Sequence, residues 1–171
     1  HEPDYEAFTA GLPSGGSVLD LGCGPGHWAA RFRDDGYTVT AMDASPEMAT
    51  YAQDAYDLEV TVGRFEDITS ETSYDGIWAF FSLLHAPRSE FPGHLLRLHN
   101  ALRPRGMLAL GMKLGTAEGR DELGRFYAYY SEDELRTLLS EAGFTPLGAR
   151  RGNGKGLAGA EETFIVLTAH A

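Results

Sequence analysis

The sequence predicts an α/β fold in which helices flank a doubly wound, largely parallel sheet. Strand-like apolar runs alternate with amphipathic helical runs along the 171 residues, which is the pattern of helices that cross over between parallel strands. One apolar run, residues 18–21, leads into a glycine-rich turn, and the next strand-like run, residues 37–42, is followed by an acidic residue. In open sheets of this class, ligands bind at the carboxyl ends of the strands.

The glycine-rich turn lies in the run from Val18 to Gly26, which reads VLDLGCGPG. Its apolar start is typical of a strand that is covered on both faces. Three glycines within five residues let the backbone turn sharply and approach a ligand without a Cβ in the way. Pro25 suits the first turn of a helix. We therefore expect a helix over 25–35 whose N-terminus faces a nucleotide.

Asp43 directly follows the strand predicted over 37–42. An acidic residue about 20 positions after a glycine loop can accept hydrogen bonds from both ribose hydroxyls of a nucleotide. Ser45 is a good N-cap and Pro46 suits the first helical position, so the next helix is expected over 46–55. The alternative for Asp43 is a carboxylate on a surface turn, and the preceding glycine loop favours the ribose role.

The rest of the chain continues the alternation of strands and helices. Leu95, Leu96, Leu98 and Leu102 are expected to form the apolar stripe of the helix over 88–101. Residues 103–106, which read RPRG, predict a turn. Ser131 with Glu134 three residues later predicts a capped helix start, and Gly143 predicts the end of that helix. The further elements expected are strands over 58–62, 75–80, 106–112, 144–150 and 162–169 and helices over 88–101 and 131–142.

The pattern D-x-G-x-G-x-G from Asp20 to Gly26 resembles motif I of the class I S-adenosylmethionine (SAM)-dependent methyltransferases, and Asp43 stands where that family has its acidic residue. The resemblance implies a Rossmann-like sheet of seven strands in the order 3-2-1-4-5-7-6, with strand 7 antiparallel. It also implies S-adenosyl-L-methionine as cofactor and S-adenosyl-L-homocysteine (SAH) as product. It extends over almost the full length, so we expect residues 1–171 to form a single methyltransferase domain. The chain begins at His1, which leaves open whether residues of the natural N-terminus are missing.

The resemblance further implies which residues bind the cofactor. Cys23 is either a nucleophilic thiolate or a small residue that offers only its backbone, and the family's usage favours the second interpretation. Arg64 stands where many relatives place an aspartate that accepts from the adenine amino group. We therefore expect Phe65 to pack on the adenine and Glu66 to act as substitute acceptor, although Glu66 suits a solvated turn equally well. The cofactor-binding residues expected are Asp20, Gly22, Cys23, Gly24, Gly26, Asp43, Ala44, Met48, Phe65, Glu66, Ala79 and Phe80.

His85 lies past the carboxyl end of the strand over 75–80, where family members place groups that face the transferred methyl. With a reference pKa of about 6.5, a histidine can take a proton from an acceptor at neutral pH; alternatively, His85 only shapes the pocket. The segment 113–130 combines glycines with aromatic and basic residues that either wall a substrate pocket or pack and pair locally. Catalytic roles are expected for His85 and Tyr127, and substrate contacts for Lys113, Arg125, Tyr129 and Lys155. The segment and the residues around His85 resemble small bacterial methyltransferases of the tellurite-resistance type.

Composition narrows the classes of partner. The chain has 14 basic and 25 acidic side chains and a net charge of −11, a poor match for a phosphate backbone. We therefore expect a small-molecule acceptor and no nucleic acid. No apolar run is long enough to span a bilayer, and a single cysteine fits a reducing compartment, so we expect a cytoplasmic protein without a membrane partner. The histidines show no metal-ligand spacing, so no metal is expected.

Three functions compete at this point. The first is a methyltransferase that acts on a small molecule, and the second is a module that binds SAM or SAH without turnover. The third, a nicotinamide oxidoreductase, is disfavoured because His27 stands where the dinucleotide fingerprint needs glycine or alanine. The sequence leaves open whether the methylated atom is O, N, S, Se or Te, whether a general base is needed, and the oligomeric state.

Overall fold

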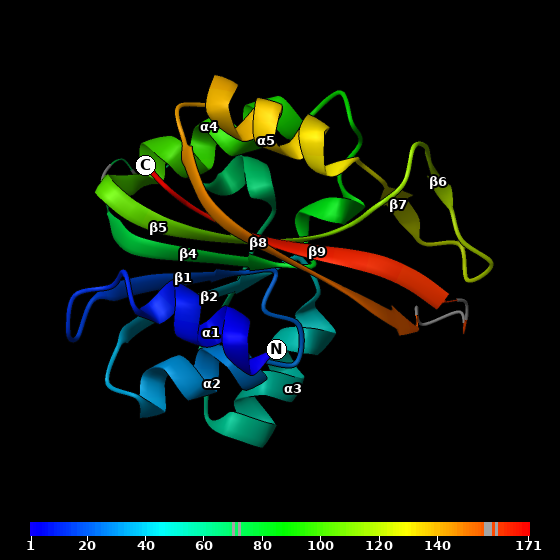
Figure 1. Ribbon diagram of the computed structural model, residues 1–171. Helices are drawn as coiled ribbons and strands as arrows, with labels where there is room; N and C mark the ends of the chain where they lie inside the picture. The colour runs from blue at the N-terminus through cyan, green and yellow to red at the C-terminus, as the bar shows by residue number, and fades with distance from the viewer. Residues whose placement is uncertain (70, 72, 156–158, 160) are drawn as a thin grey trace.

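The computed structural model describes residues 1–69, 71, 73–155, 159 and 161–171. A seven-stranded sheet in the order β3-β2-β1-β4-β5-β9-β8 forms the middle layer, with helices α1 to α3 on one face and α4 and α5 on the other (Figure 1). The strands of the sheet are β1 (Ser17–Leu21), β2 (Thr38–Asp43), β3 (Val60–Val62), β4 (Tyr74–Phe80), β5 (Leu102–Lys113), β8 (Thr145–Lys155) and β9 (Glu161–His170). The helices are α1 (Glu2–Thr9), α2 (His27–Asp34), α3 (Pro46–Tyr56), α4 (Phe91–Ala101) and α5 (Glu132–Glu141), with one-turn 3-10 helices η1 (Phe65–Asp67) and η2 (Leu83–His85).

The observed strand order agrees with the expected order for the first five strands of the sheet. Only the numbers of the last two strands differ. β1 pairs in parallel with β2 and β4, β3 in parallel with β2, and β5 in parallel with β4, while β9 runs antiparallel to β5 and β8. The expected order ends in 5-7-6, and the observed order ends in β5-β9-β8. The difference arises from two short unpredicted strands, β6 (Glu118–Arg120) and β7 (Phe126–Ala128), which form a separate antiparallel hairpin within 113–130.

The first helices differ from the prediction in two ways. The unpredicted α1 packs Tyr5 and Phe8 against Phe32 of α2 and the buried indole of Trp78. Helix α2 begins at His27 rather than at residue 25, because its N-cap Gly26 has a left-handed backbone with φ of 94°. Only glycine adopts such a conformation at little cost.

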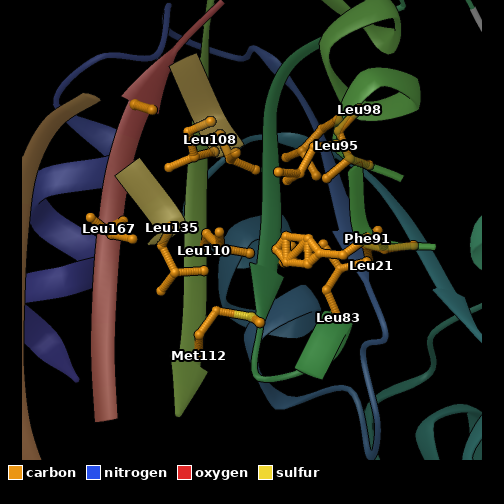
Figure 2. Packing of buried hydrophobic residues seen from close by; sticks show 14 of the residues in the cluster. Leu21, Leu83, Phe91, Leu95, Leu98, Leu108, Leu110, Met112, Leu135 and Leu167 are labelled. Atoms are coloured by element: carbon orange, nitrogen blue, oxygen red, sulfur yellow. The ribbon is translucent and has the colours of Figure 1, made fainter. Parts of the chain in front are cut away.

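The larger part of the core lies between the sheet and the helices α4 and α5. Figure 2 shows leucine side chains of β5, α4 and α5 packed around Phe91. The prediction that Leu96 belongs to the apolar stripe is wrong, because Leu96 is 51% exposed and faces solvent on α4. The predicted capping box that starts α5 is confirmed, since Ser131 accepts from the Glu134 amide and the Glu134 carboxylate accepts from the Ser131 amide.

Two predicted connections belong to strands instead. The turn expected at 103–106 is an irregularity within β5, where Arg105 has a φ of 62° and the pairing with β4 shifts register. Residues 151–155, which follow the strand expected over 144–150, are also strand, since β8 continues through Lys155 in register with β9; residue 156 lies outside the described residues. Within the described part of the chain, no helix has the length and apolar character needed to cross a membrane.

Candidate functional site

A cavity of about 850 Å³ opens at the carboxyl ends of β1, β2 and β4. Its wall is formed by the strand ends, η1, η2 and the hairpin β6–β7. The cavity therefore lies at the edge of the sheet where the glycine turn predicted a ligand. The predicted site residues that line it are Gly22, Gly24, Asp43, Ala44, Met48, Phe65, Glu66, His85 and Arg125. The unpredicted lining residues are Leu21, Met42, Ser45, Gly63, Arg64, Phe81, Ser82, Ala86, Pro87 and Glu90.

The glycine turn needs its glycines for two different reasons. Gly22 and Gly24 have φ values of 72° and 54°, a conformation that side chains with a Cβ rarely adopt. A Cβ added to Gly22 would lie 2.3 Å from the Ser82 Cβ, whereas one added to Gly24 would meet no protein atom within 4 Å. Gly22 is therefore required for packing, and Gly24 keeps a surface of the cavity open.

Asp43 ties the glycine turn to the start of α3. Its Oδ2 accepts from the Gly24 amide at 2.8 Å and its Oδ1 accepts from the Ser45 amide at 2.9 Å. Ser45 in turn caps α3, because its Oγ accepts from the Met48 amide at 3.2 Å. Each carboxylate oxygen of Asp43 keeps a further lone pair for a ligand in the cavity it lines.

Three of the predicted cofactor residues lie outside the cavity wall. Asp20 is 2% exposed below the turn, and its Oδ2 finds no hydrogen-bond partner within the described parts of the chain. Burial raises the pKa of Asp20 to about 7, against the opposing effect of a backbone hydrogen bond from Ala29. Burial likewise raises the pKa of Cys23 to about 12, which disfavours a thiolate at this position. Gly26 caps α2 and packs against Ala52.

β4 ends at Phe80, as predicted, and its last two residues lie outside the cavity wall. Ala79 is fully buried, and Phe80 stacks on Trp78 at 4.5 Å between ring centroids on the face covered by α1 and α2. Because β4 runs through Phe80, the residues that reach the ligand edge are Phe81 and Ser82. Ala79 and Phe80 therefore do not line the cavity, and the contact of their backbone with the cofactor stays a prediction.

His85 lines the cavity and is held by the hairpin. Its Nδ1 lies 2.8 Å from the carbonyl oxygen of Phe126 in β7. A carbonyl only accepts, so Nδ1 carries the proton and the neutral ring has its lone pair on Nε2. Tyr127 is 5% exposed and packs beside His85 with ring centroids 4.7 Å apart, outside the cavity wall.

One of the four predicted substrate residues reaches the cavity. The guanidinium of Arg125 donates to Asp121 at 2.6 Å, and its Nε has no partner among the residues that the structure describes. Lys113 instead forms an ion pair with Glu162 and lies over the Tyr127 ring. Two others stand away from the cavity wall: Tyr129 packs against Gly115, and Lys155 is exposed at the end of β8.

A cluster absent from the predictions lies at the cavity rim, where Glu66 of η1 meets α4. The Nε2 of His94 is 3.6 Å from Glu90 Oε2 and 3.9 Å from Glu66 Oε1. His94 is 2% exposed, and burial lowers its pKa. Glu90 and His94 are four residues apart and therefore lie on one helix face. This spacing pairs a glutamate with a histidine, so a metal-ligand pattern defined by histidines alone does not reveal it.

Comparison with known proteins identifies relatives of this chain. The family model described as a methyltransferase domain matches residues 18–106, more than half of the chain. An uncharacterised methyltransferase of Staphylococcus carnosus is 27% identical over 127 residues, which cover 74% of this chain and 60% of that protein. The malonyl-[acyl-carrier protein] O-methyltransferase of Pectobacterium atrosepticum is 34% identical over 107 residues, which cover 61% of this chain and 42% of that protein. The chain therefore spans well under two thirds of the length of these curated relatives.

A solved structure resembles the chain over nearly its whole length. It is the 1,6-didemethyltoxoflavin-N1-methyltransferase of Burkholderia thailandensis, whose structure contains 1,6-didemethyltoxoflavin and S-adenosylhomocysteine. It superposes with a TM-score of 0.81 at 29% identity and covers 98% of this chain and 76% of its own.

Proposed function

Because the chain belongs to the family of methyltransferase domains, we propose that it moves the methyl group of SAM to a small-molecule acceptor. The observation that carries the proposal is the cavity at the strand ends, where the open surface over Gly24 adjoins the Asp43 carboxylate. Its volume of about 850 Å³ lies within the usual range for cofactor and small-molecule sites.

SAM is the cofactor, and the residues present fit it. The Asp43 oxygens offer acceptors for two ribose hydroxyls, while Met48 and Phe65 line the cavity with apolar surface that suits a purine. Glu66 has an exposed carboxylate on the same wall and is proposed as the acceptor for the adenine amino group. When bound, SAM supplies a methyl group activated by its sulfonium.

We assign His85 the role of general base for the acceptor. The Phe126 carbonyl fixes the proton on Nδ1 and leaves Nε2 as the basic atom. Tyr127 packs on the ring and so acts as a positioning residue rather than a proton carrier. Arg125, on the same wall, supplies a positive charge that suits an acceptor with an anionic group.

The acceptor class is a small organic molecule or a soft anion. The excess of 25 acidic over 14 basic side chains disfavours a nucleic acid. One relative is named for malonyl-[acyl-carrier protein] and one structure holds 1,6-didemethyltoxoflavin, which supports carboxylates and nitrogen heterocycles as first candidates. The resemblance to tellurite-resistance enzymes adds thiols, selenite and tellurite to that set.

We expect calorimetry to show one binding site for SAM and for SAH and no binding of NAD. The reason is that the wall presents a ribose carboxylate and an open glycine turn, but His27 stands where a pyrophosphate-binding loop needs a small residue. A coupled assay for SAH release over carboxylates, nitrogen heterocycles, thiols and chalcogen oxyanions then identifies the acceptor. Binding of NAD in place of SAM would contradict the proposal, and tight SAM binding without turnover on any acceptor would favour the module that binds without catalysis.

Replacing His85 by glutamine is expected to lower kcat about 100-fold or more at neutral pH, the usual contribution of general-base catalysis. The glutamine amide keeps a donor for the Phe126 carbonyl but has no basic nitrogen. The deficit should shrink as the pH rises and the acceptor ionises without help, while the SAH dissociation constant stays within about twofold of wild type. Stopped assays between acid and alkaline pH, with calorimetry on both proteins, measure this. A rate deficit that is constant with pH would make His85 a positioning residue.

A further inference from the structure

We propose that Glu66, Glu90 and His94 form a binding site for a divalent transition-metal ion at the rim of the cavity. These side chains offer one imidazole nitrogen and two carboxylate oxygens, the donor set that zinc and its neighbours accept in proteins. Their ligand atoms all lie within 4.8 Å of one another. The site shares Glu66 with the proposed adenine contact, and the second carboxylate oxygen of Glu66 remains for the adenine amino group. Zn²⁺ binding itself does not depend on methyl transfer.

The buried imidazole is the observation that points to a ligand. His94 is 2% exposed, and its Nε2 has no hydrogen-bond partner within the described ranges of the chain. A buried polar atom without a partner destabilises the fold, so a ligand at this position removes that penalty. The atom faces the carboxylates of Glu66 and Glu90, which are close to half exposed. The ring is held edge-on by Phe65, with centroids 5.2 Å apart.

The distances suit coordination after a small adjustment. Nε2 lies 3.6 Å from Glu90 Oε2 and 3.9 Å from Glu66 Oε1. Two ligands at tetrahedral angles around zinc are about 3.3–3.5 Å apart, given metal–ligand bonds of about 2.0–2.2 Å. Both carboxylates end exposed side chains, so they can move to shorten these two distances and their own separation, which is at most 4.8 Å. The solvent side then offers the fourth position to water.

Arg97 sets the tautomer of His94 and competes with the metal. Its Nη1 lies 3.3 Å from His94 Nδ1, and because a guanidinium only donates, this contact keeps the proton on Nε2. Metal binding at Nε2 requires the proton on Nδ1 instead, so the Arg97 side chain must turn away. Replacing Arg97 by glutamine provides an amide oxygen that accepts from Nδ1–H, the outer contact typical of metal-bound histidines.

Metal binding would join α4 to η1. Glu90 is the N-cap residue of α4 and His94 lies in this helix, whereas Glu66 belongs to η1 together with Phe65. Phe65, Glu66 and Glu90 all line the cavity. A bound ion therefore fixes the wall on which the adenine of SAH is proposed to pack, and we expect it to raise the affinity for SAH severalfold.

Calorimetry with Zn²⁺ alone on the chelator-treated protein tests the site. We expect one Zn²⁺ per chain, with the dissociation constant raised at least about tenfold in Glu90→Gln and in His94→Gln and lowered several-fold in Arg97→Gln. His99→Gln, a histidine change five residues further along the same helix, is the matched control and should bind Zn²⁺ like the wild type. Because Glu90 is exposed, we expect Glu90→Gln to fold. This variant therefore tests the site even if His94→Gln, which changes a buried side chain, unfolds the protein.

Two further measurements bear on the proposal. Zn²⁺ should raise Tm of the wild type and of His99→Gln but not of Glu90→Gln. It should tighten SAH binding only in the proteins that bind Zn²⁺. Absence of Zn²⁺ binding tighter than millimolar, or equal binding by wild type and Glu90→Gln, would overturn the site. Zn²⁺ binding with an unchanged SAH dissociation constant would overturn its link to the cavity wall.

Discussion

Gly24→Val is expected to raise the dissociation constants of SAM and SAH at least about 100-fold, or about 2.7 kcal/mol of binding free energy, in a protein that still folds. A Cβ at Gly24 would meet no protein atom within 4 Å, so the space that the valine methyls enter is the cavity itself. The residue also has a φ of 54°, where a side chain with a Cβ costs about 1–2 kcal/mol of backbone strain. Calorimetry with SAH and thermal unfolding measure the two effects separately.

Gly15→Val is the matched control for that strain. Gly15 has a φ of 67°, and an added Cβ there would meet only the Gly36 carbonyl oxygen, at an ordinary 3.9 Å. It precedes β1 and therefore lies at the opposite end of this strand from the cavity. We expect a similar loss of unfolding free energy with unchanged SAH affinity. Equal SAH affinity in both variants would show that Gly24 does not face the cofactor.

The features that could be predicted from sequence are those that depend on neighbouring residues. The family prediction from the motif between Asp20 and Gly26 is confirmed by the family match. The turn required glycine at positive φ, and the helix after Asp43 required the cap that Ser45 provides. These are local requirements of backbone geometry and hydrogen bonding, so they leave a signature in consecutive residues.

The features that were missed depend on contacts between distant segments. Phe81 adopts a φ of 57° while its amide donates to the Gly111 carbonyl, and this tight pairing after β4 carries no sequence signature at a non-glycine residue. The tautomer of His85 depends on Phe126, 41 residues further along the chain. The contact between Glu66 and His94 likewise joins two separate elements.

Charge placement was the least predictable part of the site. The segment 113–130 lies at the ligand end of β5 as expected, but two of its three cations, Lys113 and Arg125, pair with nearby acids. Lys113 pairs with Glu162 of β9, a strand whose position relative to this segment follows only from the sheet order. Arg125 pairs with Asp121 and still reaches the cavity because the hairpin β6–β7 folds over it. Residue type alone does not indicate which cation pairs with an acid away from the cavity and which one lines the cavity.

Asp75→Ala is the control that measures how much stability is lost when a carboxylate that accepts from a backbone amide is removed. Asp75 Oδ2 accepts from the Ser17 amide at 2.9 Å and from Arg103 at 2.8 Å, near the amino ends of β1 and β4. Loss of these bonds should lower the free energy of unfolding by about 1–3 kcal/mol. Because the residue lies at the end of the sheet away from the cavity, its SAH dissociation constant should stay within about twofold of wild type.

Asp43→Ala is expected to lower the free energy of unfolding by a similar amount and, in addition, to raise the SAM and SAH dissociation constants about 10- to 150-fold. The first effect follows from loss of the acceptors for the Gly24 and Ser45 amides. The second follows from loss of charge-assisted hydrogen bonds to ribose, worth about 1.5–3 kcal/mol of binding free energy. Calorimetry with SAH on Asp43→Ala, Asp75→Ala and wild type measures the difference. A folded Asp43→Ala protein that binds SAH as tightly as Asp75→Ala would show that the carboxylate organises the glycine turn but does not bind ribose.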